Sequence, residues 1–167
     1  DLPVIYVIEN NKYGMGTSIE RASAVTELYK RGESFGISGA QVNGMDVLEV
    51  RAAAEEAAAW CRAGKGPYIL EMKTYRYRGH SMSDPAKYRT REEVDAMRKQ
   101  HDPIDHIRDL LKGQNVDDVR LKDIDSDVKA MVTAATEFAQ SSPEPDSSEL
   151  FTDILLPLTD ARLVAKA

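Results

Sequence analysis

Two neighbouring asparagines follow an apolar run near the start of the chain. Residues 4–8 are Val-Ile-Tyr-Val-Ile, and Asn10 and Asn11 come shortly after them. Such a run is typical of a buried parallel strand, and ligands bind beyond the carboxyl ends of parallel strands. Amide oxygens are hard donors that suit Mg²⁺ or Ca²⁺, and Gly14 and Gly16 allow a close approach of the backbone. The pattern indicates a metal or phosphate site; a plain strand-turn-helix connection is the alternative.

A basic loop is the second candidate site. It follows an apolar segment at residues 68–75 and contains His80. If both strands are parallel, it leaves the same sheet edge as Asn11. Histidine or arginine there could donate charge-assisted hydrogen bonds to a diphosphate or a carboxylate, each worth about 1.5–3 kcal/mol. The arginines are Arg76, Arg78, Arg89 and Arg91. In the alternative, the loop is solvated and its arginines pair with Asp84, Glu92 and Glu93.

The other histidines and the single cysteine indicate no further chemistry. His101 and His106 flank the start of a predicted helix, where surface or capping roles are expected. Cys61 lies in an alanine-rich run and is expected to be a small core residue. The histidines and the cysteine do not have the spacing of a zinc site, so no zinc is expected.

Strand and helix patterns alternate along the chain. Strands are expected at residues 4–8, 40–42 and 68–75, and helices at residues 19–30, 47–62, 91–99, 102–111 and 124–140. Thr17 and Glu20 have capping-box spacing and Gly32 is a stop signal, while Asp46 is an N-cap for the alanine-rich helix. This order predicts an α/β fold with a mostly parallel sheet and flanking helices.

The C-terminal third reads as helical. Within 124–140, apolar residues recur at helical spacing and are expected to lie in a core. They are Val128, Met131, Val132, Ala135 and Phe138. Residues 141–148, rich in Ser, Pro and acidic residues, predict a linker, and the tail from Phe151 is expected to pack on another subunit.

Composition excludes some classes of function. The 167 residues fit one domain, and 22 basic against 28 acidic residues leave a net charge of −6, which argues against a nucleic-acid partner. Because apolar runs stay below 18 residues, no membrane span is expected.

Two blocks of sequence resemble the alpha subunit of the pyruvate dehydrogenase decarboxylase component, a thiamine-diphosphate enzyme family. Residues 9–18 (ENNKYGMGTS) resemble the closing half of the thiamine-diphosphate motif. Residues 74–85 (TYRYRGHSMSDP) and 88–93 (YRTREE) resemble the flexible active-site loop of that subunit. The resemblance implies a cofactor-binding α/β domain over 1–78, an active-site loop at 79–90, and a helical region of the same domain with its tail over 91–167.

The resemblance also implies roles for single residues. Asn11 matches the asparagine whose side chain binds Mg²⁺, and Tyr13 matches the residue that binds Mg²⁺ through its backbone carbonyl. Gly14 follows in the turn against the diphosphate. His80 matches the active-site histidine of the loop, which is expected to be catalytic and to contact the cofactor. Ser81 matches the main regulatory phosphoserine of mitochondrial relatives.

The chain departs from the family pattern in two places. The family motif opens with Gly-Asp-Gly, whose aspartate is a Mg²⁺ ligand, and this tripeptide does not occur here. The chain is therefore expected to be the C-terminal part of a longer subunit and to be inactive alone. Residues 84–88 are shorter than in mitochondrial relatives and lack a second phosphoserine, which favours a bacterial, cytoplasmic enzyme; a eukaryotic one would lie in the mitochondrial matrix.

The implied reaction is thiamine-dependent oxidative decarboxylation of pyruvate with acetyl transfer to a lipoyl-bearing acyltransferase. The implied partner is a beta subunit in an α2β2 heterotetramer, which supplies the catalytic glutamate. A branched-chain 2-oxo acid or acetoin dehydrogenase alpha subunit is one alternative, although Met15 and the sequence YRGHSMSD fit the pyruvate type better. A non-catalytic α/β interaction module is the other; an upstream Gly-Asp-Gly would separate enzyme from module.

Overall fold

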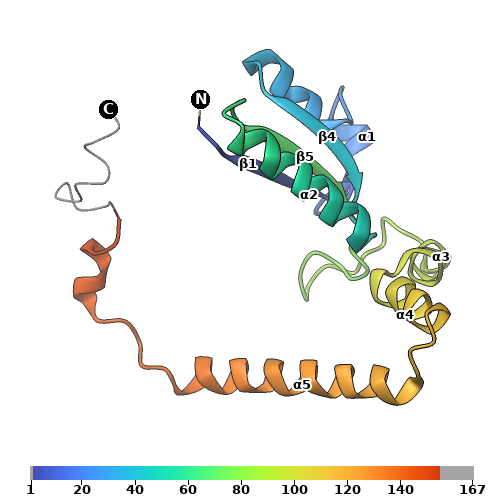
Figure 1. The fold of residues 1–167 in the computed structure, drawn as a ribbon. Coiled ribbons are helices and arrows are strands. Elements are labelled where there is room, and N and C mark those ends of the chain that lie inside the picture. Colours follow the sequence, from blue (N-terminus) through green and yellow to red (C-terminus); the bar gives the residue numbers. More distant parts are fainter. Residues whose placement is uncertain (1, 155–167) are drawn as a thin grey trace. The chain divides into compact units, whose positions relative to one another are not determined.

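Residues 2–154 are described by the computed structural model, which divides into two compact units (Figure 1). The first unit is Asp1–Val116 and the second is Asp117–Ala167. The expected packing of the tail falls largely on residues 155–167, which lie outside the described residues.

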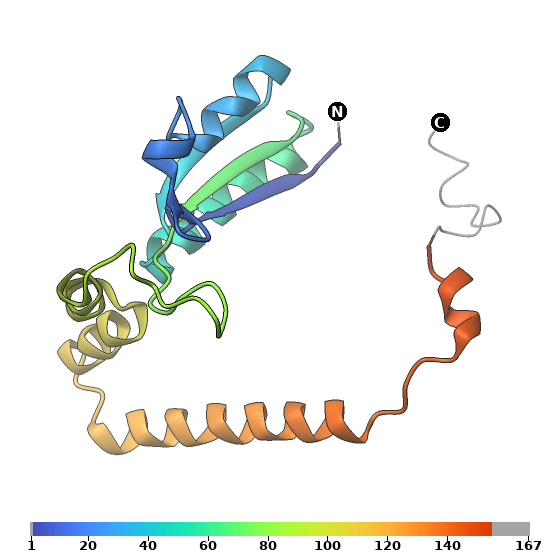
Figure 2. The same ribbon diagram turned by 180° about the vertical axis from the view of Figure 1, so that it is seen from behind.

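A three-stranded parallel sheet forms the centre of the first unit. Its strands are β1 (Ile5–Asn10), β4 (Ser38–Asn43) and β5 (Tyr68–Lys73). The order is β1-β5-β4, and both pairings are parallel, as Figures 1 and 2 show. Asn10 and Asn43 both pair with Lys73, so the carboxyl ends of the three strands are level. The prediction of an α/β fold with a parallel sheet is confirmed.

The bounds of all three strands differ from the predicted ones. β1 begins at Ile5 and not at Val4, and β4 extends beyond the predicted residues 40–42 at both ends. β1 continues to Asn10 because the ladder closes there, where the Thr74 backbone N–H donates to the Asn10 carbonyl at 2.9 Å. β5 therefore ends at Lys73, two residues before the predicted end at Tyr75. The extension matters because it places Asn10 within the sheet rather than in the turn.

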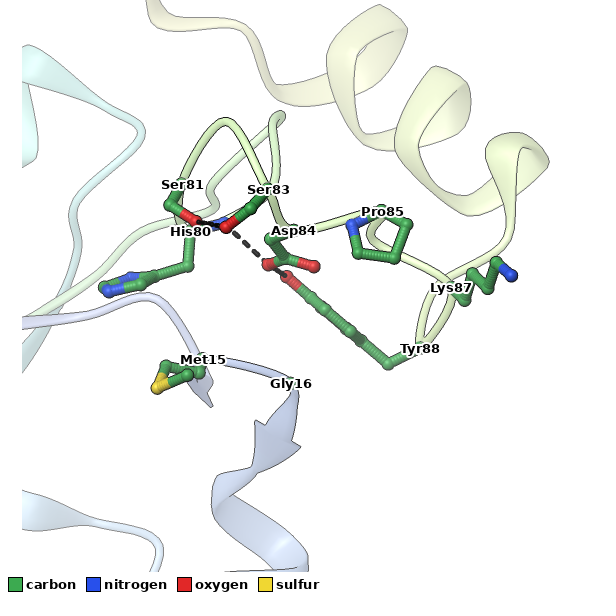
Figure 3. A pocket seen from close by; sticks show the side chains of 9 residues that line it. All are labelled: Met15, Gly16, His80, Ser81, Ser83, Asp84, Pro85, Lys87 and Tyr88. Carbon is green, nitrogen blue, oxygen red and sulfur yellow. Dashed lines mark hydrogen bonds between the residues drawn. The ribbon is translucent and has the colours of Figure 1, made fainter.

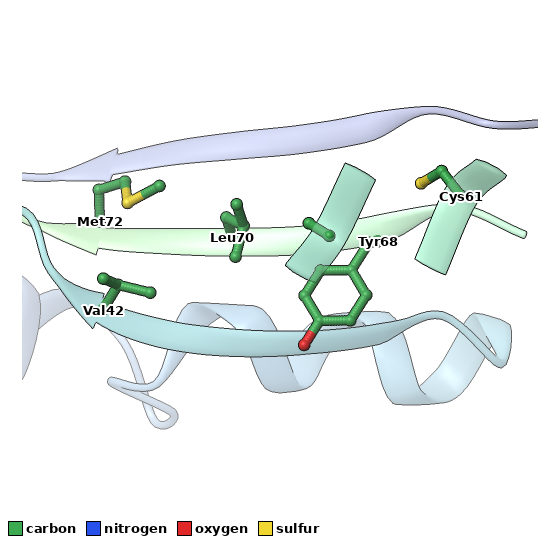
Figure 4. Packing of buried hydrophobic residues seen from close by; sticks show 6 residues of the cluster. Val42, Cys61, Tyr68, Leu70 and Met72 are labelled. Carbon is green, nitrogen blue, oxygen red and sulfur yellow. The ribbon is translucent and has the colours of Figure 1, made fainter. Parts of the chain in front are cut away.

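Helix α2 (Val47–Arg62) covers one face of the sheet and has the predicted bounds. Asp46 is its N-cap, accepting hydrogen bonds from the Leu48 and Glu49 backbone N–H groups. Alternate residues of β5 point at this helix, and Leu70, 1% exposed, lies at the centre of the cluster in Figure 4. Cys61 belongs to the same cluster, so its predicted core role is confirmed.

The 3₁₀ helix η1 (Leu28–Phe35) packs against β4 and β5 and overlaps the last three residues of the predicted α-helix. The predicted helix at 19–30 is wrong beyond α1 (Ile19–Ala22), and Gly32 is not a stop. A Cβ at Gly32 would lie 2.6 Å from the Ile69 side chain, so glycine is needed where η1 meets the sheet. The segment ends instead at Gly36, which has a φ of 69°.

The predicted capping box is wrong because Thr17 is part of a small hairpin. Strands β2 (Tyr13–Gly14) and β3 (Thr17–Ser18) pair antiparallel, with Gly14 opposite Thr17. Ser18 is the N-cap residue of α1 and makes no side-chain cap hydrogen bond. The hairpin folds back over the end of β1 and becomes a wall of the site described below.

The helical predictions for the rest of the chain are confirmed in kind. Helices α3 (Arg91–His101) and α4 (Pro103–Gly113) complete the first unit, and Thr90 and Asp102 cap them. In the second unit, α5 (Asp118–Ser141) begins six residues before the predicted Ile124, because Asp117 caps it by accepting from the Arg120 N–H. The 3₁₀ helix η2 (Ser147–Phe151) follows.

The predicted core stripe on α5 is wrong. The helical spacing is as predicted, but Val128, Met131, Val132 and Phe138 are between 48% and 74% exposed, and Ala135 is exposed too. Periodicity identifies an apolar stripe and does not say whether anything in the described chain covers it.

Candidate functional site

The turn after β1 is held from inside the sheet by Asn10. Its Nδ2 donates to Oε1 of Glu71 at 2.6 Å, and its Oδ1 accepts from the Lys12 backbone N–H at 2.9 Å. Lys12 has a φ of 69°, in the left-handed region, so the side-chain bond stabilises a backbone conformation that a lysine rarely adopts. Asn10 is buried, and the orientation of its side-chain amide determines the backbone conformation at the start of the turn.

Asn11 repeats this geometry one residue later. Its Oδ1 accepts from the Tyr13 backbone N–H at 3.0 Å. The side-chain-to-backbone turn expected of a plain connection is therefore present at both asparagines. An amide oxygen has two lone pairs, so this hydrogen bond leaves Asn11 Oδ1 with one acceptor position for a ligand.

A cavity of about 400 Å³ opens beside this turn. The turn, the β2–β3 hairpin and η1 form its walls, and the lining includes Asn11, Tyr13, Gly14, Thr17, Ser23 and Arg31. A Cβ built on Gly14 would meet no atom within 4 Å, so the space beside this glycine is open. The structure thus brings the predicted residues Asn11, Tyr13 and Gly14 to one cavity.

A second cavity, of about 330 Å³, lies under the loop that follows β5 (Figure 3). His80, Ser81, Asp84 and Tyr88 line it from the loop, and Met15 lines it from the hairpin. The His80 side chain is exposed and points away from Asp84. His80 therefore lines a different cavity from Asn11 and Tyr13, and the structure does not bring these three together around one space.

Asp84 organises the loop around its carboxylate. It accepts hydrogen bonds from the backbone N–H groups of His80 (2.7 Å) and Ala86 (2.8 Å) and from the Tyr88 hydroxyl (2.8 Å). These three bonds favour the charged form and lower the pKa of Asp84 to about 2. A Cβ at Gly79 would lie 2.5 Å from the Asp84 carbonyl oxygen, so the loop closes tightly on itself.

The buried Arg89 binds the loop itself. Arg89 is 7% exposed and donates to the carbonyls of Arg76 and of Arg78, the latter at 3.0 Å. Its guanidinium lies 5.1–5.5 Å from the ring centroids of Tyr13, Tyr75 and Tyr88, a cation–π cage. The exposed Arg91 instead approaches Asp95 at 3.9 Å. Neither interpretation of the sequence included such a role for Arg89.

The hairpin and the loop contact each other directly. Arg76 donates to the Met15 carbonyl at 2.9 Å and to the Tyr88 hydroxyl at 3.0 Å. The rings of Tyr13 and Tyr88 lie 5.2 Å apart, and a Cβ at Gly16 would lie 3.0 Å from the Tyr88 ring. The prediction that turn and loop leave the same sheet edge is confirmed.

This pair of segments is the part of the chain that carries the family resemblance. Residues 1–148 match the model of the dehydrogenase E1 component family. The chain belongs to this family.

Known relatives of this E1 family member are similar over most of its length. It is 62% identical over 157 residues to the pyruvate dehydrogenase E1 component subunit alpha of Rhizobium meliloti (strain 1021), which covers 93% of the chain and 45% of that protein. The identity is 57% over 155 residues to the same subunit of Zymomonas mobilis, with 93% and 44% covered. It is 52% over 151 residues to the somatic mitochondrial form of Bos taurus, with 89% and 38% covered. The chain spans less than half the length of these relatives.

The donors of this E1 segment suit a hard cation. Asn11 Oδ1 and the backbone carbonyls of the turn are neutral oxygens, which Mg²⁺ accepts when phosphates complete its shell. Among residues 2–154, no group of three or more His, Cys, Asp or Glu side chains is placed to hold a metal ion.

The two remaining histidines and the membrane prediction of this E1 segment can also be compared with the structure. His101 and His106 are exposed, as predicted, and His106 Nε2 lies 3.4 Å from Asp46 Oδ2. No helix within residues 2–154 has the length and apolar character needed to cross a membrane.

Sequence reasoning did not single out Glu71 and Asp84, whose hydrogen bonds organise the turn and the loop. Glu71 is a single acidic residue inside the apolar strand Tyr-Ile-Leu-Glu-Met-Lys, and it is fully buried. That isolated charge was a readable signal, because a carboxylate in a buried strand needs partners. Asp84 was considered only as a partner for arginine, whereas it accepts from the backbone and from Tyr88.

Proposed function

We propose that this chain is part of the alpha subunit of a pyruvate dehydrogenase E1 component. In this proposal the subunit decarboxylates pyruvate with thiamine diphosphate and passes the acetyl group to a lipoyl group on an acyltransferase partner. The observation that carries it is the contact between the Asn11–Gly14 turn and the His80 loop at the carboxyl edge of the sheet. Identities of 52–62% to pyruvate dehydrogenase E1 alpha subunits support the substrate.

The turn is the proposed site of the magnesium diphosphate. Asn11 Oδ1 and the Tyr13 carbonyl would each give one oxygen to Mg²⁺, and the open space at Gly14 would admit the diphosphate. Thiamine diphosphate, when bound, supplies the electron sink for decarboxylation. Two neutral ligands are few, so the rest of the subunit and the beta subunit complete the site, and the chain alone is expected to be inactive.

The loop is the proposed catalytic and regulatory element. His80 would donate an imidazole N–H to a phosphate or carboxylate oxygen, and an imidazole can also serve as a general acid or base. Ser81 Oγ lies 3.0 Å from Ser83 Oγ. A phosphate on Ser81 would add about −1.5 to −2 charge close to the Asp84 carboxylate, in the cavity that both residues line. Phosphorylation of Ser81 would therefore open the loop and inhibit the enzyme.

The proposed assembly is an α2β2 heterotetramer that meets a lipoyl-bearing acyltransferase. A bacterial, cytoplasmic enzyme is proposed, because residues 84–88 lack a second phosphoserine position. The chain also has mitochondrial relatives at 52% identity, for which the matrix would be the compartment.

Reductive acetylation by the full-length subunit tests the proposal. The full-length subunit, reconstituted with its beta subunit and lipoyl domain, is assayed with pyruvate, with branched-chain 2-oxo acids and with acetoin. We expect activity that requires thiamine diphosphate and Mg²⁺, with kcat/KM highest for pyruvate. A preference for a branched-chain acid or acetoin would assign the chain to the related dehydrogenases. An absence of thiamine diphosphate binding would assign it to a non-catalytic module.

A further inference from the structure

Glu71 is a fully buried carboxylate at the centre of the sheet. Its Oε1 accepts from Asn10 Nδ2 at 2.6 Å, and its Oε2 accepts from the Tyr29 backbone N–H at 3.1 Å. Burying a carboxylate is costly unless hydrogen bonds replace its water. Both oxygens are used, each by a different element, so the side chain connects β1 and η1 across β5.

These two elements form opposite walls of the 400 Å³ cavity. On one side, Asn10 links Glu71 to the turn. Its Oδ1 accepts a hydrogen bond from the backbone N–H of Lys12, and this bond stabilises the left-handed conformation of Lys12. On the other side, Tyr29 lies in η1, whose Leu28 and Arg31 line the cavity. An apolar residue at position 71 would fill the same space without fixing the direction of Asn10.

We propose that Glu71 is a positioning residue that sets the geometry of the Asn11 and Tyr13 oxygens toward Mg²⁺. It touches neither the metal nor the cofactor, and acts by orienting Asn10, which in turn holds Lys12 and the turn. Mutation of a residue that orients a metal ligand usually weakens metal binding by about 10- to 100-fold. The proposal rests on the proposed magnesium diphosphate site, and its test separates the two.

The first measurement uses Glu71→Gln in the full-length subunit reconstituted with its beta subunit. Glutamine has the same size but only one carbonyl oxygen for the two N–H donors of Asn10 and Tyr29. One of these two hydrogen bonds is therefore lost. Calorimetric titration is carried out well below the melting temperature. It gives the Mg²⁺ concentration at which thiamine diphosphate binding is half-saturated, the Mg²⁺ midpoint. We expect this midpoint to rise by about 10-fold.

Two further variants separate positioning from stability. Leu70→Ala removes a buried side chain from the other face of the same strand; it should lower the melting temperature and leave the Mg²⁺ midpoint unchanged. Asn10→Ala breaks the Glu71 connection from its other end and should raise the midpoint as Glu71→Gln does. The double variant should show a smaller effect than the product of the two single ones, because both remove the same connection.

Hydrogen exchange without any ligand gives an independent reading. Peptides over residues 9–16 should exchange at least several-fold faster in Glu71→Gln and Asn10→Ala, while peptides from α2 stay as protected as in the wild type. Should Glu71→Gln fail to fold, Asn10→Ala decides the question by the same two measurements.

The outcomes are distinct. An unchanged Mg²⁺ midpoint in Glu71→Gln, with a melting temperature lowered as in Leu70→Ala, would make Glu71 a purely structural residue and overturn the inference. Unchanged exchange at residues 9–16 would overturn it as well. If the wild type shows no magnesium-dependent thiamine diphosphate binding, the proposed function fails, and faster exchange in Glu71→Gln would still show that Glu71 holds the turn.

Discussion

The turn after β1 and the loop after β5 leave the same edge of the sheet but are stabilised in different ways. The turn is anchored from below by buried side chains, with Glu71 bonded to Asn10 and Asn10 bonded to the Lys12 N–H. The loop is anchored by the carboxylate of Asp84, which collects three hydrogen bonds at the surface. The turn thus depends on the sheet, and the loop depends on itself and on the hairpin.

This difference assigns different tasks to the two segments. Ligands for a small cation need fixed geometry, and a connection to a central strand supplies it because the strand opens only with the whole sheet. Of the three Asp84 bonds, the one from the His80 N–H is exposed, and exposed hydrogen bonds are individually weak and open at low free-energy cost. The loop is therefore suited to closing over a substrate, and the turn to holding a cofactor that stays bound.

Removing the amide oxygen of Asn11 should have the largest effect. In the reconstituted full-length enzyme, Asn11→Ala should weaken magnesium-dependent thiamine diphosphate binding by about 100-fold or more, because it removes one of few protein oxygens from the metal shell. Isothermal titration measures it. Asn11→Asp keeps an oxygen at the same place and should retain binding. If the alanine variant binds normally, Asn11 is a turn residue only.

Changing His80 should affect turnover and leave the turn untouched. His80→Ala should slow reductive acetylation by about 10- to 100-fold, which is the value of one lost charge-assisted hydrogen bond. The melting temperature should stay close to wild type, because the exposed imidazole is not part of the Asp84 hydrogen bonds. A lowered melting temperature with an unchanged rate would contradict a catalytic role.

The structural elements that could be predicted from the sequence are those determined by residues close together in the chain. Helix α2 begins and ends where predicted because Asp46 caps it and alanines favour it locally. The asparagine turn was recognisable for the same reason. The helix predicted over 19–30 ends at Ala22, and the chain then forms η1, in which Gly32 fits against Ile69, a contact between residues 37 positions apart. Such a contact cannot be read from local pattern.

The site was predictable to a similar extent. Its ligand candidates lie in short motifs, so Asn11, Tyr13 and His80 could be named from the sequence by resemblance. The tyrosine cage of Arg89 could not, because Tyr13 and Tyr75 reach it from two different strand ends. The exposed apolar stripe of α5 teaches the same lesson, since spacing predicts a face and not its partner.

Replacing Arg89 should loosen the contact between loop and hairpin. Arg89→Lys keeps the charge but loses the planar fork that donates to two carbonyls and stacks on the tyrosines. We expect a loss of about 2 kcal/mol in the free energy of unfolding, measured by urea denaturation. Arg91→Lys is the matched control: Arg91 is exposed, its contact with Asp95 is long, and no measurable change is expected. Equal effects of the two substitutions would show that the cage contributes little.

Protonation of Asp84 in acid should loosen the loop, and this is the smallest of the expected effects. The pKa of Asp84 in the ordered loop is about 2, below its ordinary value of 3.8, because two backbone N–H groups and the Tyr88 hydroxyl bond the carboxylate. A depressed pKa means that the contribution to loop order is complete above about pH 4 and is lost as the pH falls toward 2. Cleavage within residues 79–88 by pepsin, corrected for its rate on an unfolded substrate, should rise over this window, while circular dichroism follows the helices separately.

Asp84→Asn tests the same contact at constant pH. Asparagine offers one acceptor oxygen where the carboxylate serves three donors, so the loop should be partly open even at pH 8. Trypsin should then cut after Arg78 or Lys87 several-fold faster than in the wild type, whereas cuts within α2 stay slow. The Mg²⁺ midpoint for thiamine diphosphate should not move, because the turn is held by Glu71 and not by the loop. A shift of that midpoint in Asp84→Asn would show that the turn and the loop are one cooperative unit, and that the contrast between them is wrong.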